Sequence, residues 1–336
     1  MEKTKQIKRM FSLLSAYKMR RITCSYLPLR IWIEPTNFCN LKCILCPQNS
    51  DTSKRGYMDI KLFTKIIDEV KSSVYDVNLC HRGESLFHPK IMEMIEYTNR
   101  SGIHTRLHTN ATIMTEKVSR QLLETELDLI SFSLDGYDKE TYEKFRIGAN
   151  FEAVLANIIT FLKLKKKMKR KKPYTIIQII EPEEFSKSVE KREAFRHYFD
   201  HLAIDKFYVK RPHNWAGNVP GEGEVSSSRT YSPCTFCWYA LTILWDGTVL
   251  VCPQDYFVKT PLGNVSSSSL TEIWNGEEIK KLRRKMINGE VRKLDPCRYC
   301  DRLWRKTFLG VPVTNLKAFI GENIAGYNLV RKLIRR

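Results

Sequence analysis

Three cysteines on one short stretch, Cys39, Cys43 and Cys46, constrain this chain more than any other feature. Their spacing is C-x3-C-x2-C, and they follow an apolar run, 29–33, that is typical of a β-strand. Three thiolates on one loop can bind three irons of a [4Fe–4S] cluster and leave the fourth iron without a protein ligand. Such an open position is where a metal centre can bind a reactant. The stretch therefore predicts a catalytic iron–sulfur site.

A zinc site is the alternative for these three cysteines. Structural zinc usually has a closed shell of four ligands, often supplied by paired C-x2-C units. The next cysteine along the chain, Cys80, lies inside another apolar run and is not a nearby fourth ligand. The basic N-terminus lacks the apolar core and cleavage site of a secretion signal, so disulfides are not expected for the ten cysteines. The iron–sulfur interpretation is preferred.

Strand-like and helix-like segments alternate after residue 29. Apolar periodicity predicts strands at 29–33, 77–80, 104–108, 129–134, 174–180 and 206–209. Helical periodicity falls between them, at 58–72, 90–99, 115–126, 139–146, 151–162 and 191–201. This alternation predicts a parallel α/β sheet, and by itself it allows either a barrel or a doubly wound sheet.

Polar motifs recur where the predicted strands end. They are Arg82-Gly-Glu84 after the second strand, Thr109-Asn-Ala111 after the third, Ser133-Leu-Asp-Gly136 after the fourth, and Arg146-Ile-Gly148 further on. In parallel α/β sheets the ligand lies at the carboxyl ends of the strands. We therefore expect these motifs to meet at one edge of the sheet, beside the cysteine loop.

The cysteine loop and these four motifs together resemble the radical S-adenosylmethionine (radical SAM) superfamily. The resemblance implies an open, partial (βα)6 barrel and a [4Fe–4S] cluster whose open iron is chelated by S-adenosylmethionine. In that family the reduced cluster cleaves S-adenosylmethionine, and the 5′-deoxyadenosyl radical abstracts a hydrogen atom from the substrate. A reducing electron donor such as flavodoxin or ferredoxin is then an expected partner. Leu45 departs from the family, which more often has an aromatic residue there.

The resemblance also implies cofactor-binding residues. Gly83-Glu84 is similar to the family's GGE motif, which binds the amino group of S-adenosylmethionine, with Arg82 in place of the first glycine. A carboxylate facing an ammonium group forms a charge-assisted contact. The full set implied by the four motifs is Gly83, Glu84, Asn110, Ser133, Asp135 and Arg146.

Candidates for catalysis and substrate contact follow the sixth predicted strand, at the mouth of the predicted barrel. They are Arg211 and His213, with Asn214 and Trp215 beside them. Cys24 and Cys80 are interpreted as small apolar residues.

A second cysteine set lies in the last third of the chain, at Cys234, Cys237, Cys252, Cys297 and Cys300. An Asp-Gly pair at 246–247 between two apolar runs predicts a β-hairpin that brings the first three together. This block resembles the SPASM/twitch extension of radical SAM enzymes, which binds auxiliary [4Fe–4S] clusters. The resemblance implies one auxiliary cluster held by Cys234, Cys252, Cys297 and Cys300, with Cys237 as the alternate to Cys234. A structural zinc site is the alternative, because four thiolates satisfy zinc too.

The predicted architecture is α/β, a partial (βα)6 radical SAM barrel with a small C-terminal SPASM/twitch α+β extension. The expected divisions are a basic N-terminal helix or tail at 1–26, the core at 27–215, the auxiliary-cluster domain at 216–304 and a basic amphipathic tail at 305–336.

The net charge of +19 is concentrated in three segments. Residues 1–21 and 305–336 each carry seven Lys or Arg and one Glu, and residues 163–172 carry eight Lys or Arg and no acid. Such runs are usually solvated surface, but they can also contact lipid or nucleic acid. Absence of a long apolar run argues against a membrane span. A cytoplasmic protein, with peripheral contact at the inner membrane face as a possibility and nucleic acid as the less favoured partner, is expected.

The expected function is that of a radical SAM enzyme, an oxidoreductase acting on a small or lipid-linked substrate. Alcohol oxidation of a sugar or cyclitol suits an auxiliary cluster that accepts an electron. The 28 residues before the first predicted strand leave no room for the N-terminal peptide-recognition domain of many peptide-modifying relatives. The alternatives are peptide, protein or RNA modification, and a non-catalytic iron–sulfur protein.

Overall fold

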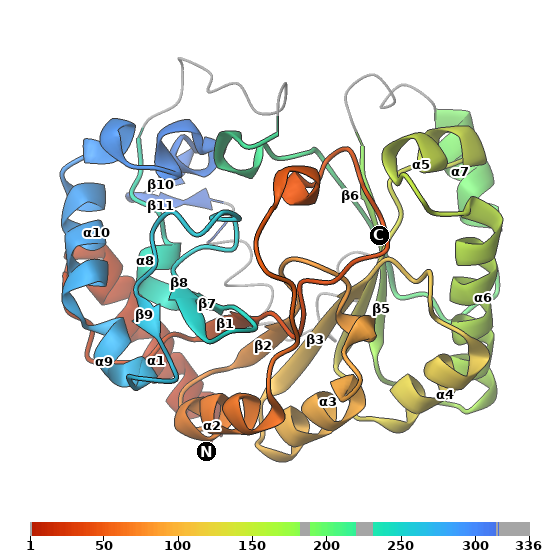
Figure 1. Ribbon diagram of the computed structural model, residues 1–336, viewed down its shortest axis with the longest axis horizontal. Coiled ribbons are helices and arrows are strands. Elements are labelled where there is room, and N and C mark those ends of the chain that lie inside the picture. The colour runs from red at the N-terminus through yellow and green to blue at the C-terminus, as the bar shows by residue number, and fades with distance from the viewer. Residues whose placement is uncertain (1, 182–188, 220–230, 314, 316–336) are drawn as a thin grey trace.

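The computed structural model describes residues 2–181, 189–219, 231–313 and 315 (Figure 1). The expected C-terminal amphipathic tail at 305–336 therefore lies largely outside the described residues. No helix among the described residues is long and apolar enough to cross a membrane.

One nine-stranded sheet organises the described part of the chain. Its strands, in spatial order, are β6 (Lys206–Lys210), β5 (Tyr174–Ile180), β4 (Leu129–Ser133), β3 (His104–Thr109), β2 (Asp76–Leu79), β1 (Arg30–Ile33), β7 (Ala240–Ile243), β8 (Thr248–Leu250) and β9 (Gly263–Asn264). Strands β1 to β6 pair in parallel, as the alternation predicted. A separate two-stranded ribbon joins β10 (Thr307–Phe308) and β11 (Val311–Pro312).

Helices connect these strands. The first group is α1 (Glu2–Lys18), α2 (Ile60–Val70), α3 (Ile91–Arg100), α4 (Glu116–Glu124), α5 (Lys139–Phe145), α6 (Phe151–Lys167) and α7 (Val189–His197). The second group is α8 (Phe236–Tyr239), α9 (Leu270–Trp274) and α10 (Glu277–Ile287). In Figure 1 the second group lies on one side of the strands, and α4 to α7 lie on the other.

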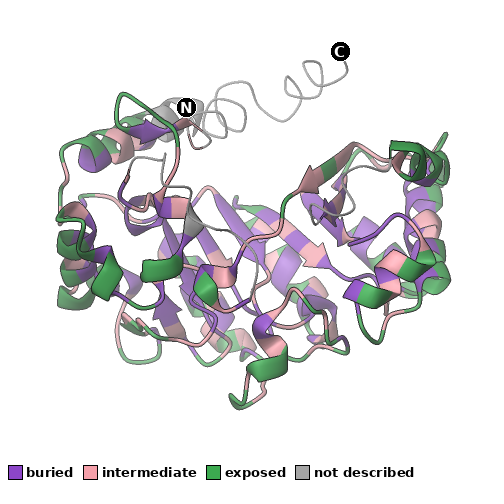
Figure 2. Ribbon diagram, turned by 90° about the horizontal axis from the view of Figure 1, so that it is seen from above, coloured by how far each residue is buried: buried purple, intermediate pink, exposed green. Residues whose placement is uncertain are grey.

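The core forms between the outer face of the sheet and the helices. Alternate strand residues such as Ile31, Ile33 and Leu79 are fully buried there, and Phe63 and Ile67 of α2 pack in the same cluster. Each such side chain contributes about 1.5–3 kcal/mol when fully buried. Figure 2 shows buried strands in the centre and helices whose outer surfaces are exposed. This core fixes the sheet whose carboxyl edge carries the candidate site.

The C-terminal cysteine region continues this sheet. Strand β7 pairs with β1 in parallel, with Trp32 opposite Thr242, and β8 returns antiparallel as the predicted hairpin. The first cysteine loop follows β1, and the second cysteine set lies beside β7 and β8. The two cysteine sets are therefore next to neighbouring strands of one sheet. The predicted boundary between the core and the auxiliary-cluster domain stays a prediction.

The N-terminal helix α1 packs on the body of the protein. Met10 and Tyr17 are buried, and the Tyr17 hydroxyl donates to the Pro233 carbonyl at 2.9 Å. Pro233 immediately precedes Cys234. Helix α1 therefore docks on the body of the protein, next to the second cysteine set.

The basic run 163–172 is partly built into the fold. Helix α6 extends to Lys167, beyond its predicted end, so Lys165 is 3% exposed and pairs with Asp205 at 2.9 Å. Lys172 pairs with Asp128 at 2.8 Å. These two charges have intramolecular partners, which reduces the charge that the run can offer to another molecule.

Candidate active site

The first cysteine loop is tied by its backbone to later strand ends. Lys42 N–H donates to the Ile147 carbonyl at 2.9 Å, and Glu84 N–H donates to the Phe38 carbonyl at 2.7 Å. These two bonds join the loop to the segment after α5 and to the turn after β2. The loop is therefore held against the carboxyl edge of the sheet, where the sequence motifs were expected to meet.

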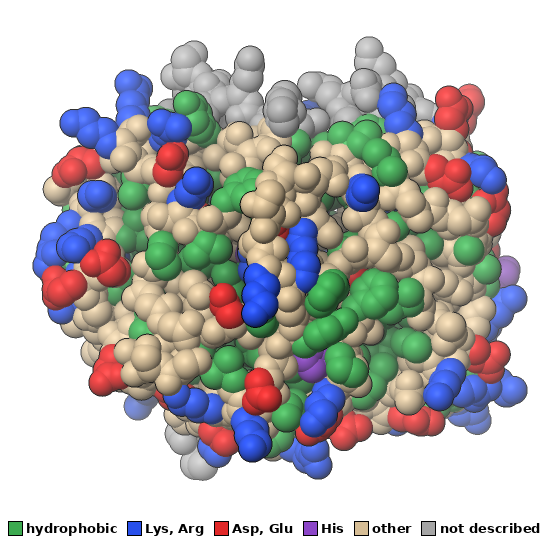
Figure 3. Space-filling model, in the orientation of Figure 1, with side chains coloured by type: hydrophobic (Ala, Val, Ile, Leu, Met, Phe, Trp, Pro, Cys, Tyr) green, Lys and Arg blue, Asp and Glu red, His purple; other side chains and the backbone are tan. Residues whose placement is uncertain are grey.

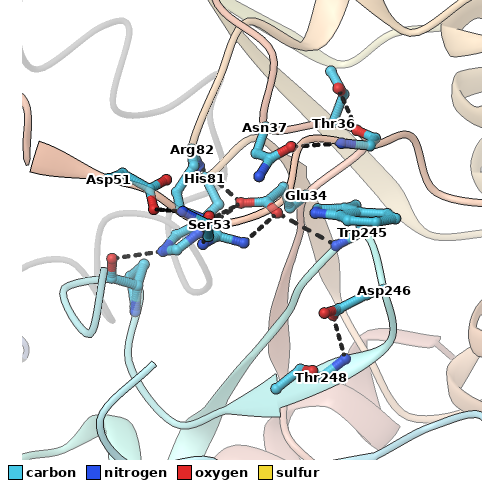
Figure 4. Close-up of polar contacts among 12 residues, drawn as sticks. Glu34, Thr36, Asn37, Asp51, Ser53, His81, Arg82, Trp245, Asp246 and Thr248 are labelled. Carbon is cyan, nitrogen blue, oxygen red and sulfur yellow. Dashed lines mark hydrogen bonds and ion pairs between the residues drawn. The ribbon is translucent and has the colours of Figure 1, made fainter. Parts of the chain in front are cut away.

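Asn37 fixes the start of this loop (Figure 4). Its amide nitrogen donates to the Lys54 carbonyl at 2.8 Å, and its amide oxygen accepts from Gly56 N–H at 2.9 Å. The Thr36 hydroxyl donates to the Gly56 carbonyl at 2.7 Å. Both ends of the 36–56 segment are thus fastened together around the cysteines.

The three thiols lie close enough to influence one another. Burial raises the pKa of Cys39 to about 11 and that of Cys43 to about 12, and the neighbouring cysteine charges add to both increases. Burial also raises the pKa of Cys46. Binding of iron requires thiolates, so it would displace these protons. Three clustered thiols on one braced loop fit a cluster with one open iron.

The turn after β2 packs directly on the cysteine loop. A Cβ on Gly83, whose φ is +73°, would lie 2.6 Å from the carbonyl oxygens of Thr36 and Phe38, so only glycine fits. Glu84 is 3% exposed and accepts from Asn110 N–H at 2.7 Å, and burial raises its pKa. Among the described residues no cation pairs with this carboxylate. A buried carboxylate without a counter-cation fits an ammonium group, as the resemblance implies.

Asn110 lies beside the first cysteine. Its amide nitrogen is 3.9 Å from the Cys39 sulfur and 3.2 Å from the Asn40 side-chain oxygen. The next residue, Ala111, has φ +60°, where the family's turn has glycine. The structure therefore keeps the backbone of that turn despite the strain of a Cβ.

Asp135 and Arg146 form a buried ion pair of 2.6 Å. Asp135 also accepts from Ile180 N–H at 3.0 Å, and the charge of Arg146 acts on Cys43. The pair is thus beside the cysteine loop, with Asp135 positioning Arg146. Ser133 ends β4 and is half-buried.

The segment after β6 reaches the cysteine loop. The Trp215 indole N–H donates to the Leu45 carbonyl, between Cys43 and Cys46, at 2.9 Å. His213 packs edge-on against Trp215, and its buried Nδ1 has no hydrogen-bond partner. Burial lowers the pKa of His213 to about 4, with help from nearby cations. Arg211 is exposed, and the structure does not bring it together with His213.

The second cysteine set is assembled from three separate segments. Cys234 and Cys237 flank the start of α8, Cys252 follows β8, and Cys297 and Cys300 bound a 3₁₀ turn. Burial raises the pKa of Cys297, and the charges of Cys234, Cys252 and Cys300 raise it further. These four thiols therefore lie close enough to influence one another's pKa.

Cys234 and Cys237 have different surroundings. The charge of Cys234 acts on both Cys252 and Cys297, whereas Cys237 is 1% exposed and hydrogen-bonds to Cys234. That hydrogen bond lowers the pKa of Cys234 to about 7. This geometry favours Cys234 as the ligand, and the assignment stays a prediction. In the part of the chain that the structure describes, no three His, Cys, Asp or Glu side chains could hold a single metal ion.

A buried polar cluster around Glu34 joins the two cysteine regions (Figure 4). Glu34, fully buried after β1, accepts from Arg82 Nε at 2.8 Å and from Arg82 Nη2 at 2.9 Å. His81 lies 3.1 Å from the same carboxylate, and its other ring nitrogen is 2.7 Å from the Pro253 carbonyl, directly after Cys252. Arg82, which departs from the family's motif, therefore holds Glu34 in place at this contact between the two cysteine regions. We refer to the contact made by Glu34, His81, Arg82 and Pro253 as the joint.

Tyr256 lies at the same joint. It is fully buried, and its ring packs edge-on against Trp215 at 5.7 Å and beneath the Arg82 guanidinium at 5.9 Å. The Tyr256 hydroxyl is near Cys46 and moderates the pKa increase that burial causes there. A residue four positions after Cys252 thus approaches the first cysteine set.

Sequence reasoning missed Glu34 and Tyr256. Glu34 occurs at a strand end, which was the signal used for the other motifs, but it does not belong to a motif of the resembled family. Tyr256 gave no signal, because its role depends on how the loop after β8 packs.

Comparison with known protein families agrees with both halves of this site. Residues 33–189 match the radical SAM superfamily, and residues 234–301 match an iron–sulfur cluster-binding domain, SPASM. The first match contains Cys39, Cys43 and Cys46, and the second contains all five later cysteines. These matches imply a radical SAM [4Fe–4S] cluster, auxiliary iron–sulfur binding and S-adenosylmethionine as cosubstrate.

Curated relatives have several activities. The chain is 23% identical over 297 residues to a tungsten-containing aldehyde ferredoxin oxidoreductase cofactor-modifying protein of Pyrococcus furiosus, covering 75% of this chain and 82% of that protein. It is 32% identical over 133 residues to an AdoMet-dependent heme synthase of Methanosarcina barkeri, covering 39% of this chain and 38% of the relative. The two relatives differ in what they act on or make, a cofactor in the first and heme in the second.

Solved structures share the fold. BtrN in complex with AdoMet and 2-DOIA is 17% identical, with a TM-score of 0.57 over 82% of this chain and 93% of that chain. Streptococcus suis SuiB bound to the precursor peptide SuiA is 16% identical, with a TM-score of 0.64 over 89% of this chain and 75% of that chain. The chain belongs to the radical SAM superfamily and is a radical SAM enzyme with a C-terminal SPASM domain.

Proposed function

We propose that this enzyme oxidises an alcohol of a small or lipid-linked substrate, such as a sugar or cyclitol, with an auxiliary cluster as electron acceptor. One observation carries the proposal. The loop that follows Cys252 packs directly on the loops that surround Cys46, through His81 and Tyr256. A substrate bound at the first cluster would therefore lie near the second.

Our ligand assignment uses the two cysteine sets. Cys39, Cys43 and Cys46 would hold the radical cluster, and Cys234, Cys252, Cys297 and Cys300 would hold one auxiliary cluster. Glu84 binds the amino group of S-adenosylmethionine, supported by its burial and its lack of a cationic partner. Gly83 allows the close approach of the loops, and Asn110, Ser133 and Arg146 line the same edge.

Cys39, Cys43 and Cys46 would hold the cluster that supplies reductive cleavage of S-adenosylmethionine, with one electron from a donor of the flavodoxin or ferredoxin class. Hydrogen-atom abstraction would occur at the carbinol carbon of the substrate. The hydroxyl would lose its proton to a base of the protein, and a cluster held by Cys234, Cys252, Cys297 and Cys300 would accept the remaining electron as the carbonyl forms. S-adenosylmethionine, cleaved to methionine and 5′-deoxyadenosine, is the net oxidant, so no further oxidant is required.

His213 is our candidate for accepting the hydroxyl proton. Its Nδ1 is buried without a partner, and a pKa of about 4 keeps the ring neutral near pH 7. A neutral imidazole with a free nitrogen can act as a general base. Trp215 and Tyr256 are large rings on the same side and would exclude water. Arg211, being exposed, is supported only by its place after β6.

Anaerobic turnover with sugars and cyclitols deuterated at the carbinol carbon tests the proposal. We expect deuterium in 5′-deoxyadenosine and an equimolar ketone or aldehyde. His213→Asn should slow product formation by about 10²-fold or more, the usual contribution of a general base. If 5′-deoxyadenosine forms with both clusters intact and none of these alcohols yields a carbonyl product, the oxidation proposal is wrong.

A further inference from the structure

The inner face of the sheet carries more positive than negative charge. Arg30 and Arg106 both pair with Asp76, at 2.5 Å and 2.8 Å, so one carboxylate lies between two guanidiniums. Lys210, at the end of β6, adds a further cation. On the outside, in contrast, Figure 3 shows basic and acidic side chains interspersed around the rim of the visible face.

Lys210 points into this interior. Phe207 and Val209 of β6 pack against the apolar core, so alternation directs Lys210 to the opposite face. The Lys210 charge acts to lower the pKa of His108 on β3 and of Cys80 after β2, two residues at strands distant from β6 in the sheet order. Lys210 therefore faces the space enclosed by β2, β3 and β6.

No described residue forms a hydrogen bond or ion pair with the Lys210 ammonium. Burial lowers its pKa, and the charge of Asp135, which already pairs with Arg146, acts on the pKa in the opposite direction. Burying an unpaired charge is costly, so such groups are usually kept for a function. A ligand of opposite charge would remove that cost.

Further polar groups on the same face also lack partners. The Asn78 side-chain amide nitrogen and the Thr242 hydroxyl are buried without hydrogen-bond partners. Both lie in the layer of Trp32, which is opposite Asn78 on β2 and opposite Thr242 on β7. Burial and the nearby cations lower the pKa of His108 to about 3, so this ring is neutral. A neutral imidazole, an amide and a hydroxyl can each donate a hydrogen bond.

We propose that this interior binds an anionic group of the substrate, a phosphate or a carboxylate, with Lys210 as its counter-ion. The inference deepens the proposed function and rests on it, because it describes the substrate of the same site. An anchored anion would fix the depth at which the reacting carbon faces S-adenosylmethionine. Neutral sugars and cyclitols would then be poor substrates beside their phosphates or acids.

The carboxylate of S-adenosylmethionine is the competing partner for Lys210. Arg146 lies nearer the first cysteine set, since its charge acts on Cys43, and Asp135 holds it there. We therefore assign the cosubstrate to Arg146 and the substrate anion to Lys210, and the experiment separates the two.

Binding of inorganic phosphate and of ¹³C-labelled acetate to the reconstituted holoenzyme, saturated with S-adenosylmethionine, tests the inference. Line broadening of the ³¹P or ¹³C signal is recorded with oxidised and with reduced clusters, because reduced clusters broaden only nearby nuclei. We expect broadening that depends on reduction and an affinity that falls by about tenfold or more in Lys210→Gln, which is about 1.4 kcal/mol. The stronger of the two probes identifies the anion.

Lys206→Gln is the matched control, because it removes one positive charge from the same strand. The Lys206 ammonium lies 5.1 Å from the Tyr208 ring. Equal loss in both variants, or broadening that survives Lys210→Gln, would overturn the inference. So would a loss of S-adenosylmethionine affinity in Lys210→Gln as large as the loss of anion affinity. Cleavage of S-adenosylmethionine by the parent is measured separately, and its absence would count against the proposed function instead.

Discussion

The two cysteine sets differ in how the chain builds them. Cys39, Cys43 and Cys46 lie on one loop, whereas Cys234, Cys252, Cys297 and Cys300 come from three segments. The first loop is held by backbone bonds to strand ends, and the second set depends on the packing of α8, the hairpin and the 3₁₀ turn. The first set can form from residues that are close in sequence, whereas the second set requires three distant segments to fold together.

Loss of a ligand from each set should separate the two roles most clearly. Cys43→Ala should abolish cleavage of S-adenosylmethionine, because the radical cluster loses one of three ligands. Cys252→Ala should retain cleavage and lose carbonyl formation. Both are measured by chromatography of anaerobic reactions under dithionite. Carbonyl formation that persists in Cys252→Ala would remove the electron-acceptor role.

The two neighbours Cys234 and Cys237 sharpen the account of the second cysteine set. Cys234→Ala should lose the auxiliary cluster, about four irons per chain, while Cys237→Ala keeps it. The reason is that the charge of Cys234 acts on both Cys252 and Cys297, whereas Cys237 interacts with Cys297 and Cys234. Iron analysis of the two variants decides the ligand, and the reverse result would reassign it to Cys237.

Arg82 tests the joint between the two regions. Arg82→Met leaves the fully buried Glu34 carboxylate without its guanidinium, which should lower the free energy of unfolding by about 3–5 kcal/mol. Denaturant unfolding of the anaerobic holoenzyme measures it. Arg120→Met, which breaks the exposed pair with Glu116, is the control and should change stability little. Equal effects would mean that the joint does not stabilise the fold.

Much of the fold was predictable because its signals are local. Strand β5 has the predicted bounds, and the other strands from β1 to β6 differ by one or two residues. Helix α6 was predicted too short, because the basic residues after 162 hid a turn that buries Leu164 and Lys165. Tertiary pairing with Asp205 keeps that turn helical.

The site was predictable where a motif carries it and not where packing creates it. The cysteine loop and Glu84 could be found from spacing and strand ends. The partnership of Glu34 with Arg82 and His81 joins residues 47 or more positions apart, and Tyr256 approaches Cys46 only in the folded chain. Pairing of β7 with β1, which brings the sets together, has no signal in a single sequence.

His213, which is beside Trp215, and His197, which is exposed on the surface, should have different pKa values. His213, with a pKa of about 4, should stay neutral near pH 7, while exposed His197, whose pKa Asp200 raises, should titrate above the ordinary value of 6.5. Because the folded pKa of His213 is lowered from 6.5, its contribution to stability is lost as pH falls from about 6.5 toward 4. Nitrogen-15 NMR of labelled histidine measures both, and a His213 that titrates near 6.5 would contradict the buried geometry.

The smallest expected effect concerns the turn beside the first set. Ala111→Gly removes a Cβ at φ +60° and should change the free energy of unfolding by no more than about 1 kcal/mol, in the stabilising direction. Denaturant midpoints of parent and variant measure it. A clear destabilisation would mean that the Ala111 methyl group contributes more to packing than the turn costs in strain.

Iron and sulfide content with Mössbauer spectra, on the anaerobically reconstituted parent and on the Cys39/Cys43/Cys46→Ala variant, tests the two-set account most directly. We predict about eight irons in the parent and about four in the variant, in two spectroscopically distinct clusters. About four irons in the parent and none in the variant would contradict it. The second set would then be structural, for example a zinc site, and the proposal of alcohol oxidation would fail with it.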